Sequence, residues 1–213
     1  MSTLAKQARS GILLENLQEI LDAEAHPKWA LQMGQNQYFT PKEYAEFCKQ
    51  FLRDFGRGYR ATGIDPQVGD GNLVYFGQPA SLRMGIELDN RESTGAHGHQ
   101  RITGNCVKAW EIMDDVFPEM RFTYGVANPP FGKWWKIDGK VVDSTKATWE
   151  WLLRRCRCGY MIANANTVDR LKLFDDPRAY LINYCSSLWD NCDVKLATIY
   201  FDNGESFVPS DPY

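Results

Sequence analysis

The sequence predicts one α/β domain in which helices cover both faces of a mainly parallel sheet. Short apolar runs alternate with segments of helical periodicity along most of the chain, and this alternation is typical of parallel strands joined by helices. Polar turns follow several of the apolar runs, as expected where strands end. The length of 213 residues suffices to bury roughly 70% of the unfolded surface in a single core.

Composition and charge are those of an ordinary globular protein. Hydrophobic residues make up 44% and charged residues 24% of the chain, and no apolar run approaches the roughly 20 residues that a membrane span needs. The N-terminus lacks the apolar core of a secretory signal, so we expect a cytoplasmic protein without membrane contact. The net charge of −3 argues against a wide basic surface, so any nucleic-acid contact is expected to be local or assisted by another domain.

The cysteines and histidines predict no metal site. The six cysteines lack paired C-x-x-C spacing, which argues against a zinc ribbon or a disulfide framework and favours buried free thiols. His97 and His99 lie in the polar, glycine-containing stretch 90–100, which predicts a solvated loop where a helix is usual in such folds.

Two helices are expected before the sheet begins. Apolar residues recur at helical spacing over residues 4–25, which predicts one amphipathic helix that ends before Pro27. A second helix is predicted after Thr40, which can act as N-cap, with Pro41 at the first helical position and Glu43 completing a capping box.

Later apolar runs predict strands at residues 82–88, 122–127, 159–163 and 194–201, with helices over 145–156 and 168–189. The strand expected before Asp65 is only weakly apolar. We divide the chain into an N-terminal helical extension (1–34), a core (35–204) and a tail or beginning of a linker (205–213).

A rigid polar turn follows the run 122–127. Its residues are Asn128, Pro129, Pro130 and Phe131, and the carboxyl edge of a parallel sheet is where such folds bind ligands. The prolines remove N–H donors, which leaves the Pro129 carbonyl and the Asn128 side-chain oxygen as acceptors. Phe131 offers a flat face on which a base can stack. The alternative is a proline-rich turn without a chemical role.

Two acceptors at one point suit an amino group on an aromatic ring. Such an amine is a poor nucleophile because its lone pair is delocalised into the ring. Acceptors that bind both of its hydrogens hold it in place and favour the tetrahedral nitrogen of the transition state. The turn therefore indicates electrostatic stabilisation rather than proton abstraction.

A second ligand-binding pattern precedes this turn. Gly69 and Gly71 form a G-x-G turn whose missing side chains let a bulky ligand approach the backbone. Glu87 ends the next predicted strand, where a carboxylate can accept both hydroxyls of a ribose. The order of the two elements indicates a bound nucleoside.

Together the motifs resemble the gamma-type adenine-N6 DNA methyltransferases, above all the modification subunits of type I restriction systems. The likeness covers residues 35–204 and includes, in order, Gln35-Tyr38-Phe39-Thr40-Pro41, Asp65-Pro66-x-x-Gly69-x-Gly71, Gly85-Ile86-Glu87 and Asn128-Pro129-Pro130-Phe131. It implies a Rossmann-like class I methyltransferase fold with a seven-stranded, mostly parallel sheet. It also implies methyl transfer from S-adenosylmethionine to the N6 amine of a flipped adenine in DNA, by the catalytic domain of a larger restriction-modification or phage-related protein.

The resemblance assigns roles to individual residues. It implies cofactor contacts from Tyr38, Thr40, Asp65, Gly69, Gly71 and Glu87, of which Glu87 holds the ribose. Asn105 stands where the family usually has an acidic residue beside the cofactor adenine, and its oxygen can accept the same hydrogen. Catalysis is implied for Asn128, Pro129, Pro130 and Phe131.

Aromatic and basic residues follow the catalytic motif directly. Lys133, Trp134 and Trp135 interleave charge with rings, as sites for a flipped base or a single strand do. The alternative is that the tryptophans close the core beneath a loop. Arg154, Arg155 and Arg157 end a predicted helix, where positive charge offsets the helix dipole.

Two other functions remain open at this stage. One is an RNA or protein-glutamine methyltransferase of the same fold, although the family's glutamine enzymes carry tyrosine at the position of Phe131. The other is a catalytically silent scaffold, which the unusual Asn105 and the short loop at 90–100 keep open. Because methyltransferases of this group read their target with a separate domain or subunit, we expect such a partner here.

Overall fold

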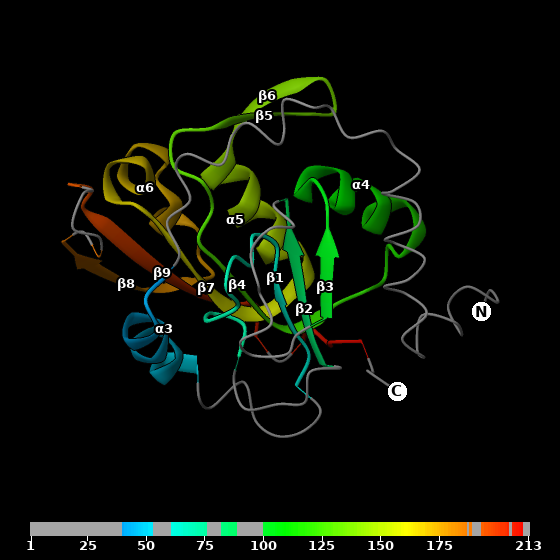
Figure 1. The fold of residues 1–213 in the computed structure, drawn as a ribbon, viewed down its shortest axis with the longest axis horizontal. Helices are drawn as coiled ribbons and strands as arrows, with labels where there is room; N and C mark the ends of the chain where they lie inside the picture. The colour runs from blue at the N-terminus through cyan, green and yellow to red at the C-terminus, as the bar shows by residue number, and fades with distance from the viewer. Residues whose placement is uncertain are drawn as a thin grey trace.

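The computed structural model describes residues 40–52, 61–75, 82–88, 100–186, 188, 193–204 and 206–210. The expected N-terminal helix, Tyr38 and the histidines of the stretch 90–100 lie outside these residues. The described chain forms a central sheet with helices on both of its faces (Figure 1).

The central sheet has seven strands. They are β1 (Gly63–Asp65), β2 (Arg83–Glu87), β3 (Gln100–Thr103), β4 (Phe122–Ala127), β7 (Cys156–Asn164), β8 (Ala179–Cys185) and β9 (Leu196–Asp202). Their order is β3-β2-β1-β4-β7-β9-β8. The first five strands of that order run parallel, while β9 is antiparallel to both β7 and β8. The mostly parallel seven-stranded sheet predicted from the sequence is therefore confirmed.

Two hydrophobic clusters lie on opposite faces of the sheet. The helices are α3 (Lys42–Lys49), α4 (Cys106–Val116), α5 (Ser144–Arg155) and α6 (Ala165–Leu171). Helix α3 packs on one face, against side chains of β4, β7 and β9. Helices α4, α5 and α6 pack on the other. No helix of the described ranges is long and apolar enough to cross a membrane.

The helix predicted over residues 168–189 is wrong beyond its first turn. Helix α6 ends at Leu171 because Lys172 adopts a left-handed conformation with φ 51°. Pro177, which cannot continue a helix, then precedes the edge strand β8. Its half-exposed apolar residues imitate helical spacing, and only pairing with β9 reveals them as a strand.

The capping box predicted at Thr40 is also wrong. Helix α3 begins at Lys42 with Pro41 as its N-cap, and no side chain caps its first turn. The Thr40 hydroxyl instead accepts a hydrogen bond from Asn128, so the residue joins two distant segments.

A hairpin that the sequence analysis missed lies at the top of Figure 1. Strands β5 (Trp134–Ile137) and β6 (Lys140–Asp143) pair antiparallel around Asp138 and Gly139. Both turn residues have positive φ, 48° and 75°, as a two-residue hairpin turn of the I′ type requires. The dipeptide Asp-Gly was the local signal for this turn.

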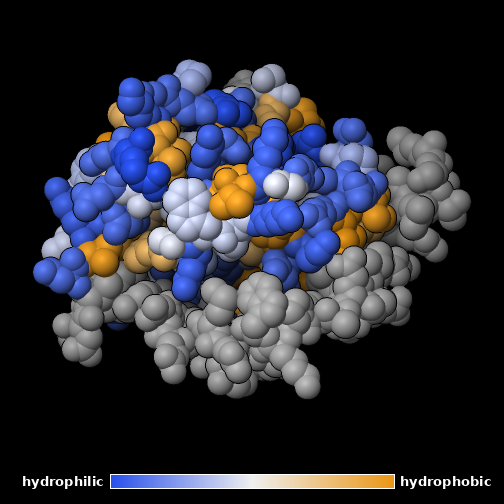
Figure 2. All heavy atoms as spheres, turned by 90° about the horizontal axis from the view of Figure 1, so that it is seen from above, coloured by the Kyte–Doolittle hydropathy of each residue, from blue (hydrophilic) through white to orange (hydrophobic). Residues whose placement is uncertain are grey.

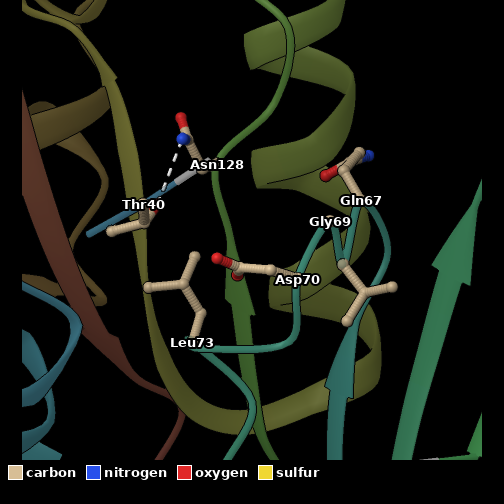
Figure 3. Close-up of a pocket in the computed structure, with 7 residues that line it drawn as sticks. Thr40, Gln67, Gly69, Asp70, Leu73 and Asn128 are labelled. Atoms are coloured by element: carbon tan, nitrogen blue, oxygen red, sulfur yellow. Dashed lines mark hydrogen bonds between the residues drawn. The ribbon is translucent and has the colours of Figure 1, made fainter. Parts of the chain in front are cut away.

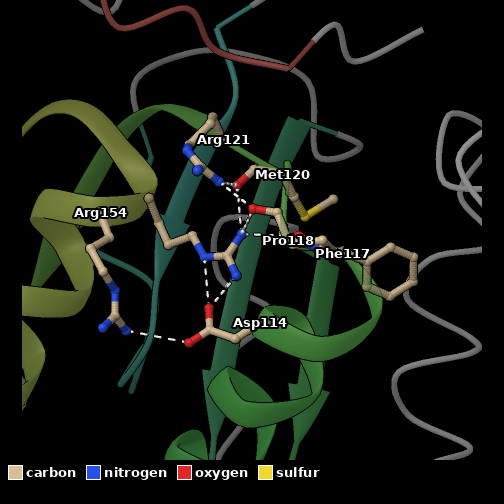
Figure 4. Close-up of polar contacts among 7 residues, drawn as sticks. Asp114, Phe117, Pro118, Met120, Arg121 and Arg154 are labelled. Carbon is tan, nitrogen blue, oxygen red and sulfur yellow. Dashed lines mark hydrogen bonds and ion pairs between the residues drawn. The ribbon is translucent and has the colours of Figure 1, made fainter.

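Arg155 connects the end of α5 to α4 and to the segment after it. Figure 4 labels its partners Asp114, Phe117, Pro118 and Met120. Its side chain is only 3% exposed and forms an ion pair with Asp114. It also donates to the carbonyls of Phe117, Pro118 and Met120 at 2.9, 3.1 and 2.9 Å. The interpretation of this arginine as a charge that offsets the helix dipole misses these contacts, because they come from a segment that is distant in sequence.

Arg155→Ala is expected to lower the free energy of unfolding by about 2–4 kcal/mol, because three carbonyls each lose one of their two donors, Asp114 loses its buried partner and the buried stem leaves a gap. Arg154 also contacts Asp114, yet its side chain is 60% exposed. Arg154→Ala should therefore change the free energy by no more than about 0.5 kcal/mol. Urea unfolding of both variants measures the difference, and equal losses would contradict the assignment.

Candidate functional site

Three neighbouring strands bring the sequence motifs to one edge of the sheet. In the register of β1, Ile64 pairs with Met84 of β2 on one side and with Gly125 of β4 on the other. Because the three strands are parallel, the segments that follow them leave the sheet side by side. These segments carry the glycine turn, Glu87 and Asn128.

A pocket of about 230 Å³, including the part open to solvent, lies at this edge (Figure 3). Its lining combines the glycine turn after β1 with Thr40, which precedes α3, and with Asn128 of the polar turn after β4. The lining residues are Thr40, Gln67, Val68, Gly69, Asp70, Leu73 and Asn128. The structure thus brings together three residues singled out from sequence, namely Thr40, Gly69 and Asn128.

The backbone of the turn after β1 requires its two glycines. Gly69 and Gly71 have φ of 52° and 85°, in the left-handed region that side-chain-bearing residues rarely adopt. The turn is closed by a hydrogen bond from the Gly71 N–H to the Val68 carbonyl at 2.9 Å. A second bond, from the Val68 N–H to the Ile86 carbonyl at 2.9 Å, attaches it to β2.

Glu87 lies against this turn. Its Oε2 accepts the N–H of Gly69 at 2.9 Å, and the side chain is half-buried. The carboxylate therefore stands beside the backbone that a ligand would approach. This is the position from which an acidic group can accept ribose hydroxyls.

The Asn128 side chain has a defined orientation. Its Nδ2 donates to the Thr40 hydroxyl at 3.2 Å, and Figure 3 shows the amide oxygen pointing away from Thr40. Thr40 is buried. The amide thus presents its acceptor rather than its donor to the side opposite Thr40.

The rest of the polar turn is hydrogen-bonded to the first residue of α5. Ser144, the first residue of α5, donates its hydroxyl to the Pro130 carbonyl at 2.8 Å and its N–H to the Lys133 carbonyl at 2.9 Å. Gly132, with φ 66°, allows the chain to turn between these points. Phe131 is half-buried and packs against the cluster under α3.

Asp65 is fully buried and is hydrogen-bonded to Gln67, which lines the pocket. Its Oδ1 accepts the N–H of Gln67 at 2.9 Å, whereas its Oδ2 has no hydrogen-bond partner among the described residues. Burial raises the pKa of Asp65 well above its usual value, and the nearby charges of Glu87 and Asp70 raise it further. A buried carboxyl of this kind favours the protonated form unless a donor or a cation approaches it.

Gln67 is a pocket residue that the sequence analysis did not single out. Its Nε2 contacts the Thr148 hydroxyl at 3.4 Å and the Cys106 sulfur at 3.6 Å, which connects the glycine turn to α4 and α5. Burial raises the pKa of Cys106 to about 12. No local signal distinguishes Gln67, because its role depends on helices far away in sequence.

Asn105 serves as the N-cap of α4. Its Oδ1 accepts the N–H of Val107 at 2.9 Å. The residue follows β3, at the same edge of the sheet as the pocket. An amide oxygen has two lone pairs, so a helix cap and a ligand contact are compatible here.

The two tryptophans after the motif have different environments. Trp135 is partly buried and packs against the core, with its ring edge-on to Trp110 and the ring centroids 5.5 Å apart. Trp134 is 59% exposed. Each of the two interpretations left open by the sequence therefore applies to one tryptophan. Trp135 packs against the core, and Trp134 is an exposed indole.

The donor set fits a nucleoside cofactor. A turn without side chains, a carboxylate at the next strand end and a buried carboxyl with an oxygen lacking a partner in the described chain all lie together. Among the residues that the structure describes, no cluster of three or more His, Cys, Asp or Glu could hold a metal ion.

No established protein-family profile and no curated protein matches the sequence. Solved structures, however, resemble the chain. The methyltransferase subunit of a type I restriction-modification system from Streptococcus thermophilus matches with a TM-score of 0.60 at 16% identity, over 84% of this chain and 48% of that chain. This chain therefore spans about half the length of that subunit.

Two further structures resemble it over more of their own length. A putative class I S-adenosylmethionine-dependent methyltransferase from Listeria monocytogenes matches with a TM-score of 0.58 at 11% identity, over 96% of this chain and 70% of that one. A putative RNA methyltransferase from Pyrococcus horikoshii matches with a TM-score of 0.53 at 17% identity, over 88% and 97%. The chain has the Rossmann-like class I methyltransferase fold.

Proposed function

We propose that this chain is the catalytic domain of an S-adenosylmethionine-dependent methyltransferase that acts on the N6 amine of an adenine flipped out of DNA. The observation that carries the proposal is the pocket in which the glycine turn after β1 meets Asn128 after β4. A cofactor held by the former would lie beside a nucleophile held by the latter.

The cofactor side of the pocket is formed by this chain's first two strand ends. Gly69 and Gly71 leave room for the ligand, and Glu87 accepts the ribose hydroxyls. Asp65 provides a negative charge once a cation compensates its burial. When bound, S-adenosylmethionine supplies an activated methyl group on a positively charged sulfur.

The substrate side is formed by the polar turn. The Asn128 amide oxygen and the Pro129 carbonyl accept the two hydrogens of the target amine, and Phe131 stacks on the base. An amide is too weak a base to remove a proton, so the residues act by position and by stabilising positive charge on the nitrogen. Thr40 fixes the amide orientation through its bond to Nδ2.

DNA is proposed as the substrate because the motif order resembles the gamma-type adenine enzymes and because one structural neighbour is named the methyltransferase subunit of a type I restriction-modification system. A neighbour named a putative RNA methyltransferase supports the second candidate, an RNA adenine. We further propose that a separate domain or subunit reads the target sequence.

The two substrates can be separated directly. The protein is incubated with isotopically labelled S-adenosylmethionine and either mixed DNA or mixed RNA, and the products are digested to nucleosides for mass spectrometry. Labelled N6-methyl-deoxyadenosine supports the proposal. Label found only in the ribonucleoside would favour the second candidate, and label in neither would contradict both.

Asn128→Ala is expected to reduce turnover roughly 100- to 1000-fold, because the interaction that it removes belongs to the transition state. Affinity for S-adenosylmethionine should remain within about threefold, since Asn128 contacts the amine rather than the cofactor. Asn183→Ala, on the edge strand β8, is the matched control and should retain activity. Parallel loss of cofactor binding in the Asn128 variant would identify the turn as structural rather than catalytic.

Glu87→Ala is expected to weaken S-adenosylmethionine binding by about 1–3 kcal/mol, because charged hydrogen bonds to the ribose are lost. Calorimetry measures the effect. Glu150→Ala removes an equally charged but exposed residue of α5 and should leave the affinity unchanged. An unaltered affinity in the Glu87 variant would remove this residue as the ribose ligand.

Asp65→Asn is expected to stabilise the ligand-free protein while weakening cofactor binding. The folded-state pKa of Asp65 lies above its unfolded value, so ionisation opposes folding, and the wild type loses stability as pH rises between the two pKa values. Asparagine does not titrate, so the advantage of the variant should increase with pH. Urea unfolding between pH 5 and 8 tests this, and a pH-independent difference would refute it.

A further inference from the structure

The β5–β6 hairpin has an inner and an outer face. Trp135, Ile137 and Val142 share the inner face and pack against the core under α4 and α5. The outer face carries Trp134 and Lys136 on β5, with Val141 opposite Lys136. Alternation along both strands therefore separates an anchoring side from a side directed at solvent.

The anchoring side makes the hairpin a rigid support. Trp135 contacts Trp110 edge-on, and Trp110 in turn stacks on Trp151 with centroids 5.2 Å apart. At the hairpin's base, Ser144 bonds to the carbonyls of Pro130 and Lys133. These contacts attach the hairpin both to the core and to the segment of the proposed catalytic turn.

The outer face presents apolar groups to water. Trp134 is 59% and Val141 69% exposed. Figure 2 views the molecule from the side on which the hairpin lies in Figure 1, and shows hydrophobic side chains set among hydrophilic ones. An exposed indole beside a reactive turn is suited to stacking on a base.

The hairpin segment as a whole, with Arg170 beside it, has a positive net charge. Residues 133–143 together with Arg170 carry four cationic side chains and two carboxylates, a net charge of +2 in a chain whose total is −3. One carboxylate, Asp143, lies opposite Trp134 and is paired with Arg170 at 2.7 Å. The hairpin thus complements a polyanion, unlike the chain as a whole.

We propose that the outer face of the hairpin binds the nucleic-acid strand that flanks the target base. Trp134 stacks on an unpaired neighbouring base and Lys136 contacts a phosphate, while Asn128 and Phe131 hold the target. This inference rests on the proposed function and adds to it the surface that receives the strand. It also explains how a chain without a wide basic surface can position a nucleic acid locally.

The stacking role is tested by binding a fluorescein-labelled, single-stranded 12-nucleotide DNA containing one adenine, measured by fluorescence anisotropy. Trp134→Ala should weaken binding roughly 5- to 100-fold, the range for loss of one stacking ring, and Trp134→Phe should recover most of it. Phe174→Ala removes another exposed ring, 44% accessible and outside the hairpin, and should have no effect. Cofactor affinity should be unchanged in all three.

The phosphate role is tested by the salt dependence of the same binding. Lys136→Ala should reduce the slope of log affinity against log salt concentration by about one. Lys140→Ala removes the same charge from the side of the hairpin that carries Ile137, and should leave the slope within about 0.3. Equal effects of the two lysines would overturn the assignment of the outer face.

Each outcome separates this inference from the proposed function. Unchanged DNA affinity in Trp134→Ala would overturn it even if the protein methylates DNA, and would assign the exposed indole to another kind of partner. Failure of the wild-type protein to bind any oligonucleotide would also overturn the inference that the hairpin binds a nucleic-acid strand. If a 12-nucleotide RNA of the same sequence binds instead and shows the same loss in Trp134→Ala, the surface is supported and the substrate is RNA.

Discussion

The contact between Tyr124 and Gly63 is the constraint on which the rest of the site depends. The two residues are paired across β1 and β4, and the tyrosine ring occupies the space in which a Cβ on Gly63 would lie, 2.2 Å from the ring. The phenol reaches past β1 and donates to the Val74 carbonyl at 2.7 Å. The Tyr124 side chain of β4 therefore contacts both β1 and Val74, which lies at the far end of the segment that contains the glycine turn.

That constraint allows the site to contain groups that oppose folding. Asp65 and Gln67 each bury an oxygen without a hydrogen-bond partner in the described chain, and such groups cost stability. They remain in place because β1 is paired on both sides. Their environment favours a ligand that supplies donors or positive charge, which is consistent with the cofactor proposed for this pocket.

Much of the fold and of the candidate site could be predicted, because some signals are local. The strand predicted at 122–127 agrees residue by residue with β4, since a central strand covered on both faces is a continuous apolar run. The glycine turn could be found because left-handed backbone favours glycine whatever surrounds it. Strand β8 could not, because its apolar residues imitate helical spacing and only its pairing with β9 at the sheet edge reveals a strand.

The sequence by itself determined which motifs end which strands, because glycine and proline restrict the backbone locally and parallel strands carry successive ends to one edge. Only the tertiary structure decided which partner each side chain meets. Thr40 bonds to Asn128 rather than to its own helix, and Trp134 is exposed whereas Trp135 packs against the core. These choices depend on contacts between segments far apart in the chain, and no local pattern specifies them.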